Sequence, residues 1–154
     1  METLSLPTIA HGERFRADPL LFAKTALGRN RWSRQEEMRR AIIDHRRVRV
    51  QSANSVGKTH ELASIICEWA CLNKNSRVIC TGPTFDQVRA GLWQEIKRAW
   101  FEAERRGVRL SDSQIGESDW ELAPGWDVSI VAVDNISAMQ GRRALKVQYD
   151  EGPN

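Results

Sequence analysis

The chain has 154 residues, of which 41% are hydrophobic and 28% charged, and its formal net charge at pH 7 is +3. This length suits one globular domain with its own core and is too short for two ordinary domains. The small basic excess permits a nucleic-acid partner without requiring one. No run of about eighteen apolar residues occurs, and no basic start leads into an apolar segment, so neither a membrane span nor a secretion signal is predicted.

The first elements in chain order are two predicted helices. Asp18-Pro19 can start a short helix that Gly28 ends, because proline suits the first turn and glycine the position after the last. Ser33 and Glu36 have capping-box spacing, which predicts the start of a second helix. That helix is expected to turn four apolar residues toward a core, namely Met38, Ala41, Ile42 and Ile43. Residues 1–45 thus form a helical lead-in.

Residues 46–154 form the predicted nucleotide-binding core, in which strands and helices alternate. Val48 and Val50 alternate with polar residues as in a short strand, and a polar loop and a helix follow. A second strand is predicted over residues 78–81. Gly82-Pro83 separates it from a long helix that Gly107 ends and whose apolar residues recur with a helical period, namely Phe85, Val88, Leu92, Ile96, Ala99 and Trp100.

The last part of the sequence has the pattern of β-structure. Residues 120–133 contain two alternating runs around Pro124-Gly125, which predicts a β-hairpin. A final strand is predicted over residues 144–149. Strands that alternate with helices indicate an α/β fold with a largely parallel central sheet.

Residues 52–59 match a phosphate-binding loop. They read Ser-Ala-Asn-Ser-Val-Gly-Lys-Thr and fit the pattern G-x-x-x-x-G-K-S/T except that Ser52 replaces the first glycine. In such a loop the backbone amides and the N-terminus of the next helix face the phosphates. Lys58 would contact the β- and γ-phosphates, Thr59 would bind Mg²⁺, and Gly57 would allow close backbone approach. The nucleotide would lie along Ser52, Ala53, Asn54, Ser55, Val56, Gly57, Lys58 and Thr59.

Two adjacent carboxylates follow the final predicted strand. Asp150 would bind the hydrated Mg²⁺ held by Thr59, and Glu151 would polarise the attacking water. Ligands of α/β proteins gather at the carboxyl ends of parallel strands, where the phosphate loop also lies. The strand itself alternates apolar and polar residues, so we expect Lys146 and Gln148 to face a wet environment.

With these elements in place, residues 15–152 resemble the ATPase domain of phage DNA-packaging terminase large subunits. Four segments carry the resemblance, and they are residues 32–35, the loop 52–59, Thr81-Gly82-Pro83-Thr84, and Met139-Gln140-Gly141-Arg142 followed by Asp150-Glu151. The resemblance implies a P-loop NTPase fold of the additional-strand, catalytic-glutamate type. The sheet would be incomplete at its C-terminal end, and the nuclease domain of this family would be absent.

The resemblance also implies roles for individual residues. Gln35 would hydrogen-bond the adenine edge, or it is simply a first-turn surface glutamine. Thr81, Thr84 and Gln87 would lie near DNA or at a coupling surface, although Thr84 serves equally as a helix N-cap. The loop lacks the arginine that many terminases carry there. Arg142 or Arg143 of a neighbouring subunit would then supply the transition-state arginine, or both are simply solvated surface arginines.

The function implied is that of a Mg²⁺-dependent ATPase motor that drives double-stranded DNA into a procapsid. The expected partners are DNA, a portal protein, a small terminase subunit and further copies of the chain, in the cytoplasm of an infected bacterium. As an isolated 154-residue chain, the ATPase is expected to be weak or inactive. The alternatives are a helicase-like ATPase and a non-catalytic nucleic-acid-binding module that uses its six tryptophans for stacking.

Cysteine usage agrees with an intracellular protein. Cys67, Cys71 and Cys80 form no C-x-x-C pair, and an odd number cannot all pair within the chain. Cys67 and Cys71 lie four residues apart on a predicted helix without further partners at zinc-site spacing. We therefore expect buried structural thiols.

Overall fold

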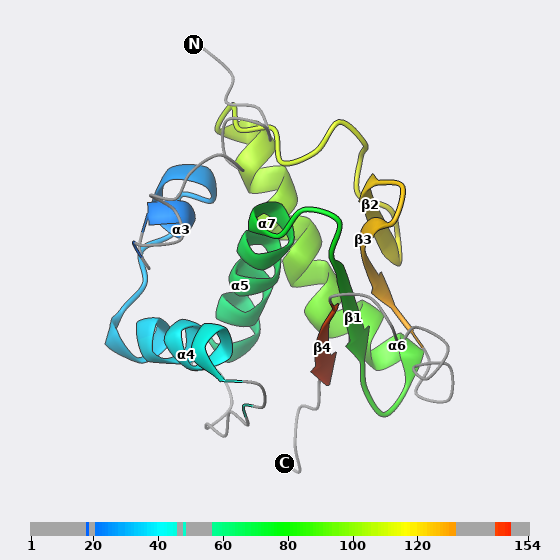
Figure 1. The fold of residues 1–154 in the computed structure, drawn as a ribbon, viewed down its shortest axis with the longest axis horizontal. Coiled ribbons are helices and arrows are strands. Elements are labelled where there is room, and N and C mark those ends of the chain that lie inside the picture. The colour runs from blue at the N-terminus through cyan, green and yellow to red at the C-terminus, as the bar shows by residue number, and fades with distance from the viewer. Residues whose placement is uncertain (1–17, 19–20, 46–47, 49–56, 132–143, 149–154) are drawn as a thin grey trace.

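A computed structural model describes residue 18, residues 21–45, residue 48, residues 57–131 and residues 144–148. This part of the chain is a small mixed α/β domain in which helices pack beside a four-stranded sheet (Figure 1). None of its helices is long and apolar enough to cross a membrane. The first predicted strand lies outside the described residues apart from Val48.

The N-terminal helices are α3 (Leu21–Ala26) and α4 (Ser33–Asp44). Gly28 follows α3 at φ +64°, a conformation that favours glycine, so its predicted role as helix stop is confirmed. The predicted capping box of Ser33 and Glu36 is wrong by one residue. The N-cap is Trp32, and its backbone N–H donates to Oε1 of Gln35 at 3.2 Å.

The apolar side chains of α4 do not enter the core as predicted. Met38, Ala41 and Ile42 are half-buried and Ile43 is 49% exposed. The buried side chain of this helix is instead Arg39, which reaches the carboxylate of Glu68 on the next helix. Hydrophobic periodicity identified the helix but misplaced its inward face.

The central helix α5 (Lys58–Leu72) leads through a short turn into β1 (Arg77–Thr81). The predicted long helix that follows consists of α6 (Phe85–Val88), a π-helical segment (Arg89–Trp93) and α7 (Gln94–Arg105). The wider π turn brings Val88 and Trp93, five residues apart, into the core together. Phe85 lies before this change of phase and is 42% exposed, so it does not share the buried face of the other residues in the predicted helical period.

Thr84 and Gly107 bound this helical segment as the sequence predicts. The hydroxyl of Thr84 accepts a hydrogen bond from the N–H of Gln87 at 3.1 Å, which is an N-cap bond. Gly107 follows α7 at φ +78°, and the next residue, Val108, donates its N–H to the carbonyl of Ala103. This pattern is a Schellman C-cap.

The sheet has the strand order β2-β3-β1-β4. The hairpin of β2 (Asp119–Ala123) and β3 (Trp126–Ile130) is antiparallel, whereas β1 pairs in parallel with both β3 and β4 (Ala144–Gln148). Two of the three pairings are therefore parallel, as predicted. Because Thr81 is the register partner of Gln148, β1 and β4 end together.

The core lies between this sheet and helices α5 and α7. Its members are mostly aliphatic and aromatic, and the largest fully buried side chains include Trp93, Trp120, Phe22, Leu27 and Ile66. The three cysteines are buried and unpaired, as predicted. Burial raises the pKa of Cys67 and Cys80 to about 12, so these thiols stay protonated and unreactive at neutral pH.

Candidate nucleotide site

The N-terminus of α5 presents the residues that the sequence assigns to phosphate binding. Gly57 is the N-cap residue, at φ +78° and ψ +16°, and Lys58 and Thr59 are the first two residues of the helix. The carbonyl of Gly57 accepts the first helical hydrogen bond, from the N–H of Glu61 at 2.9 Å. The amides of the first helical turn have no acceptor within the helix, so they can donate to an anion.

Gln35 lies against this N-terminus, although it belongs to a different helix. A Cβ built on Gly57 would lie 3.3 Å from Nε2 of Gln35, which is closer than ordinary van der Waals contact. Oε1 of Gln35 accepts from the N–H of Trp32, so Nε2 is the end of the amide that faces Gly57. Gln35 and the phosphate-loop residue Gly57, which the sequence identified separately, therefore lie next to each other at the start of α5.

The carboxyl ends of β1 and β4 lie at the same end of the molecule as the start of α5 (Figure 1). Gln148 is the last residue of β4, and the predicted Mg²⁺ and water-activating acids follow it by two and three positions. Asp150 and Glu151 themselves lie outside the described residues, as do Ser52, Ala53, Asn54, Ser55 and Val56 of the loop and the two arginines, Arg142 and Arg143.

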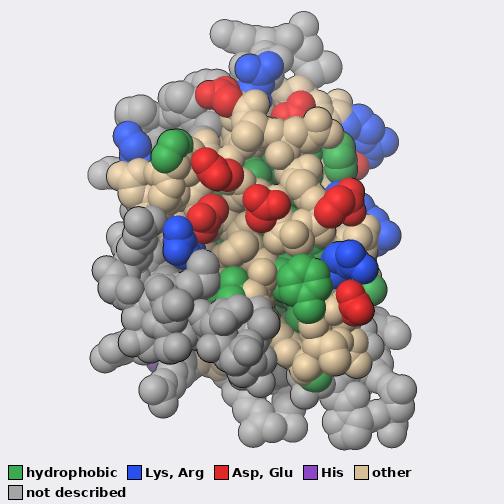
Figure 2. Space-filling model, turned by 90° about the vertical axis from the view of Figure 1, so that its right-hand side faces the viewer, with side chains coloured by type: hydrophobic (Ala, Val, Ile, Leu, Met, Phe, Trp, Pro, Cys, Tyr) green, Lys and Arg blue, Asp and Glu red, His purple; other side chains and the backbone are tan. Residues whose placement is uncertain are grey.

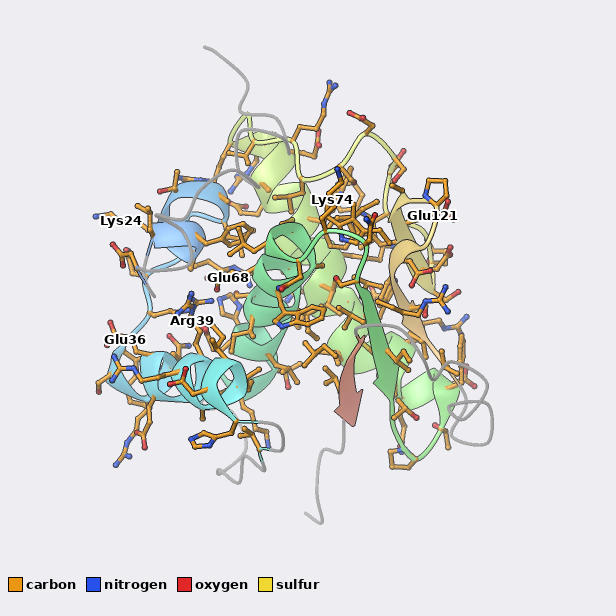
Figure 3. The ribbon with its side chains drawn as sticks, in the orientation of Figure 1. Lys24, Glu36, Arg39, Glu68, Lys74 and Glu121 are labelled. Carbon is orange, nitrogen blue, oxygen red and sulfur yellow. The ribbon has the colours of Figure 1, made fainter. Side chains whose placement is uncertain are left out.

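Sequence reasoning missed a network of buried ion pairs beside this site. Nε of Arg31 donates to Glu61, and another nitrogen of the same guanidinium lies 3.1 Å from Oε2 of Glu68. Arg39 on α4 also binds Glu68, with one N–O distance of 2.7 Å. Figure 3 shows the Arg39 and Glu68 side chains pointing toward each other between α4 and α5. All four side chains are at most 6% exposed.

One signal in the sequence could have revealed this network. Glu61 and Glu68 lie seven residues apart, on the same side of a helix whose other buried members, apart from Ser64, are apolar. Carboxylates on an apolar face need cationic partners, because buried charges are otherwise very unfavourable. The sequence does not say which of its arginines supply those partners.

Burial changes the ionisation of two groups on the first turn of α5. Desolvation raises the pKa of Glu61 to about 7 in spite of the opposing effect of Arg31. Desolvation also lowers the pKa of His60, whose Nδ1 lies 3.7 Å from Oε2 of Glu95. His60 is therefore neutral at physiological pH, and this contact is no strong ion pair.

The segment after β1 divides into a buried and an exposed part. Thr81 is 5% exposed, and its hydroxyl has no hydrogen-bond partner among the described residues. Thr84 and Gln87 are exposed, so surface contact with DNA is open to these two and not to Thr81. Val88, the next inward-facing residue, anchors the segment in the core.

The hairpin face of the domain carries many carboxylates. Glu117, Asp119 and Glu121 are exposed there, and Figure 2 shows acidic side chains spread over the described part of that face. Lys97 neutralises Glu117 through a 2.9 Å ion pair. A phosphate backbone would be repelled from this face, so it is a poor candidate for DNA binding.

The tryptophans serve mainly the core. Trp93, Trp100, Trp120 and Trp126 are buried and Trp69 is half-buried, whereas Trp32 is 52% exposed. The binding-module alternative requires several exposed tryptophans on which successive bases can stack, and only Trp32 of the described tryptophans is exposed.

Among the described residues no group of three His, Cys, Asp or Glu side chains is arranged to hold a metal ion. A pocket of about 210 Å³ lies between α4 and α5 and includes Arg39, Glu68 and Trp69 in its lining. Its two charged residues are already bound to each other. The N-terminus of α5 remains the better candidate for a ligand.

Comparison with known proteins does not assign a family. No protein-family model matches the chain, and no curated protein matches it.

Proposed function

We propose that this chain is the ATP-hydrolysing segment of a DNA-packaging motor of the terminase large-subunit type. The observation that carries the proposal is the contact between Gln35 and Gly57. A residue suited to reading a base edge and a loop suited to binding phosphates were identified from separate parts of the sequence. Their meeting at the start of α5 is what a nucleotide site requires.

The residues at this position fit a nucleoside triphosphate. The free amides of the first helical turn and Lys58 would hold the phosphates, and the Thr59 hydroxyl would face Mg²⁺. Gly57 suits the loop because a side chain there would meet Gln35. When bound, Mg²⁺ neutralises phosphate charge, and Asp150 would help to hold it.

Glu151 is the proposed base for ATP hydrolysis, because it follows the strand that ends beside β1. Arg142 or Arg143 is the proposed source of a cation for the transition state. The mixed α/β architecture with parallel β1 and β4 supports the finer fold proposal, a P-loop NTPase of the additional-strand, catalytic-glutamate type. Double-stranded DNA, a portal protein, a small terminase subunit and other copies of the chain are the proposed partners, in an infected bacterial cell.

Turnover of ATP with Mg²⁺, measured with and without double-stranded DNA, tests this function. We expect slow turnover that DNA increases and that Lys58→Ala abolishes. A strand-displacement assay on a forked duplex distinguishes the helicase alternative, since a packaging motor moves on duplex DNA without separating it. Efficient unwinding, or DNA binding without any ATP binding, would overturn the proposal.

A further inference from the structure

The buried ion pairs join α4 to α5 where apolar packing does not. The hydrophobic core cluster contains no residue of α4, and Arg39 is the buried side chain of that helix. Arg39 binds Glu68, and Arg31, which directly precedes the N-cap of α4, binds both Glu61 and Glu68. Two carboxylates on α5 thus hold the N-terminal end and the middle of the α4 segment.

Buried ion pairs fix the position of one helix relative to another more narrowly than apolar contacts do. A guanidinium presents its donors in a rigid fork, and a carboxylate accepts them only in a narrow range of orientations. Hydrophobic contact is non-directional, so it allows neighbouring helices to slide. Fixing register is also the best-supported use of buried polar groups, whose net contribution to stability is small.

The geometry assigns the Arg31–Glu61 pair a positioning role: it holds Gln35 against Gly57 and thereby sets the preference of the site for adenine. Glu61 lies on the first turn of α5, four residues after Gly57, and Arg31 lies four residues before Gln35. The pair therefore ties the segment that carries Gln35 to the helix that Gly57 begins, about one helical turn from the Gln35–Gly57 contact on each segment. This inference rests on the proposed nucleotide site and adds the residues that determine its base specificity.

The test replaces the pair without leaving a buried charge alone. The double variant Arg31→Met/Glu61→Met substitutes apolar side chains of similar length, a change that buried ion pairs often tolerate. Arg39 still neutralises Glu68 in this variant. The matched control is Arg34→Met/Glu37→Met, which removes an exposed ion pair from α4, with side chains 74% and 69% exposed.

The measurement is calorimetric titration with Mg²⁺ and each of three probes: ATP, GTP and tripolyphosphate. We expect the wild type to prefer ATP over GTP and the Arg31/Glu61 variant to lose about threefold to tenfold in that preference, the effect of one or two hydrogen bonds. Tripolyphosphate should bind both proteins equally, because it has no base. Gln35→Ala should cause the same loss, and adding it to the double variant should have no further effect.

Circular dichroism verifies that each variant is folded before titration. A folded Arg31/Glu61 variant that keeps the wild-type preference for ATP over GTP overturns the positioning role of the pair but not the proposed ATPase function. Wild-type protein that binds ATP and GTP equally also overturns it while leaving the ATPase proposal standing. Wild-type protein that binds none of the three probes overturns both.

Discussion

Nε2 of Gln35 lies 3.3 Å from the position that a Cβ on Gly57 would take, which is closer than ordinary van der Waals contact. The two residues come from α4 and from the cap of α5, and the buried ion pairs of Arg31 and Arg39 hold these segments together. Glycine at position 57 thus meets two requirements, a positive φ and room for a neighbouring amide.

Gly57→Ala should therefore lose both stability and nucleotide affinity. Alanine at φ +78° costs roughly 1–2 kcal/mol in backbone strain, and its methyl group would also push Gln35 away. Gly125→Ala is the matched control, because Gly125 has the same φ of +78° and open space around it. Urea unfolding should show similar losses for both variants, but only Gly57→Ala should weaken ATP binding in calorimetry. Equal ATP affinity in the two variants would contradict the site.

Lys58→Ala should abolish measurable ATP affinity, because Lys58 is the cation at the start of α5. Lys74→Ala is the control, since Lys74 is an exposed lysine beyond the other end of the same helix (Figure 3). Calorimetric titration with ATP and Mg²⁺ measures both variants. Equal binding by wild type and Lys58→Ala would rule out this phosphate site.

Glu151→Gln should separate binding from catalysis. Loss of a positioned base lowers turnover on the order of a hundredfold, whereas the phosphate contacts that hold ATP remain. Steady-state hydrolysis and ATP titration on the same preparation measure the two effects. Unchanged turnover would make Glu151 an ordinary surface acid.

Glu68→Ala should destabilise the fold strongly, because it leaves the buried guanidinium of Arg39 without this carboxylate and takes one partner from Arg31. Removing one partner of a buried ion pair costs about 3–5 kcal/mol. Glu37→Ala removes the exposed partner of Arg34 and should cost at most about 1 kcal/mol. Urea denaturation measures the free energy of unfolding of both variants. Similar small losses in the two would show that the buried ion pairs contribute little to stability.

The buried carboxyl of Glu61 should make stability depend on pH in a definite direction. Its pKa rises from 4.5 to about 7 on folding, mainly through desolvation, so the folded protein retains a proton that the unfolded chain releases. The stability from this group is fully present below about pH 4.5 and is lost as pH rises through about 7. We expect the free energy of unfolding of the wild type to fall relative to Glu61→Gln between pH 5 and pH 8. Both proteins contain His60, so its titration largely cancels, and parallel pH profiles would refute the raised pKa.

The sequence determined the elements whose signals are local. Thr84 caps α6, Gly28 and Gly107 end their helices, and Pro124-Gly125 turns the hairpin, because each residue acts on backbone within a few positions of itself. The residues of the proposed phosphate site were also visible in the sequence, since Gly57, Lys58 and Thr59 are contiguous.

Tertiary structure decided what depends on distant neighbours. The period of α4 placed Ile42 and Ile43 inside, yet Arg39 is the residue that turns inward, because Glu68 on another helix offers it a buried carboxylate. The contact of Gln35 with Gly57 likewise requires two helices to meet. A sequence pattern reports which face of a helix is apolar, but only the packed fold brings together the charges that neutralise each other.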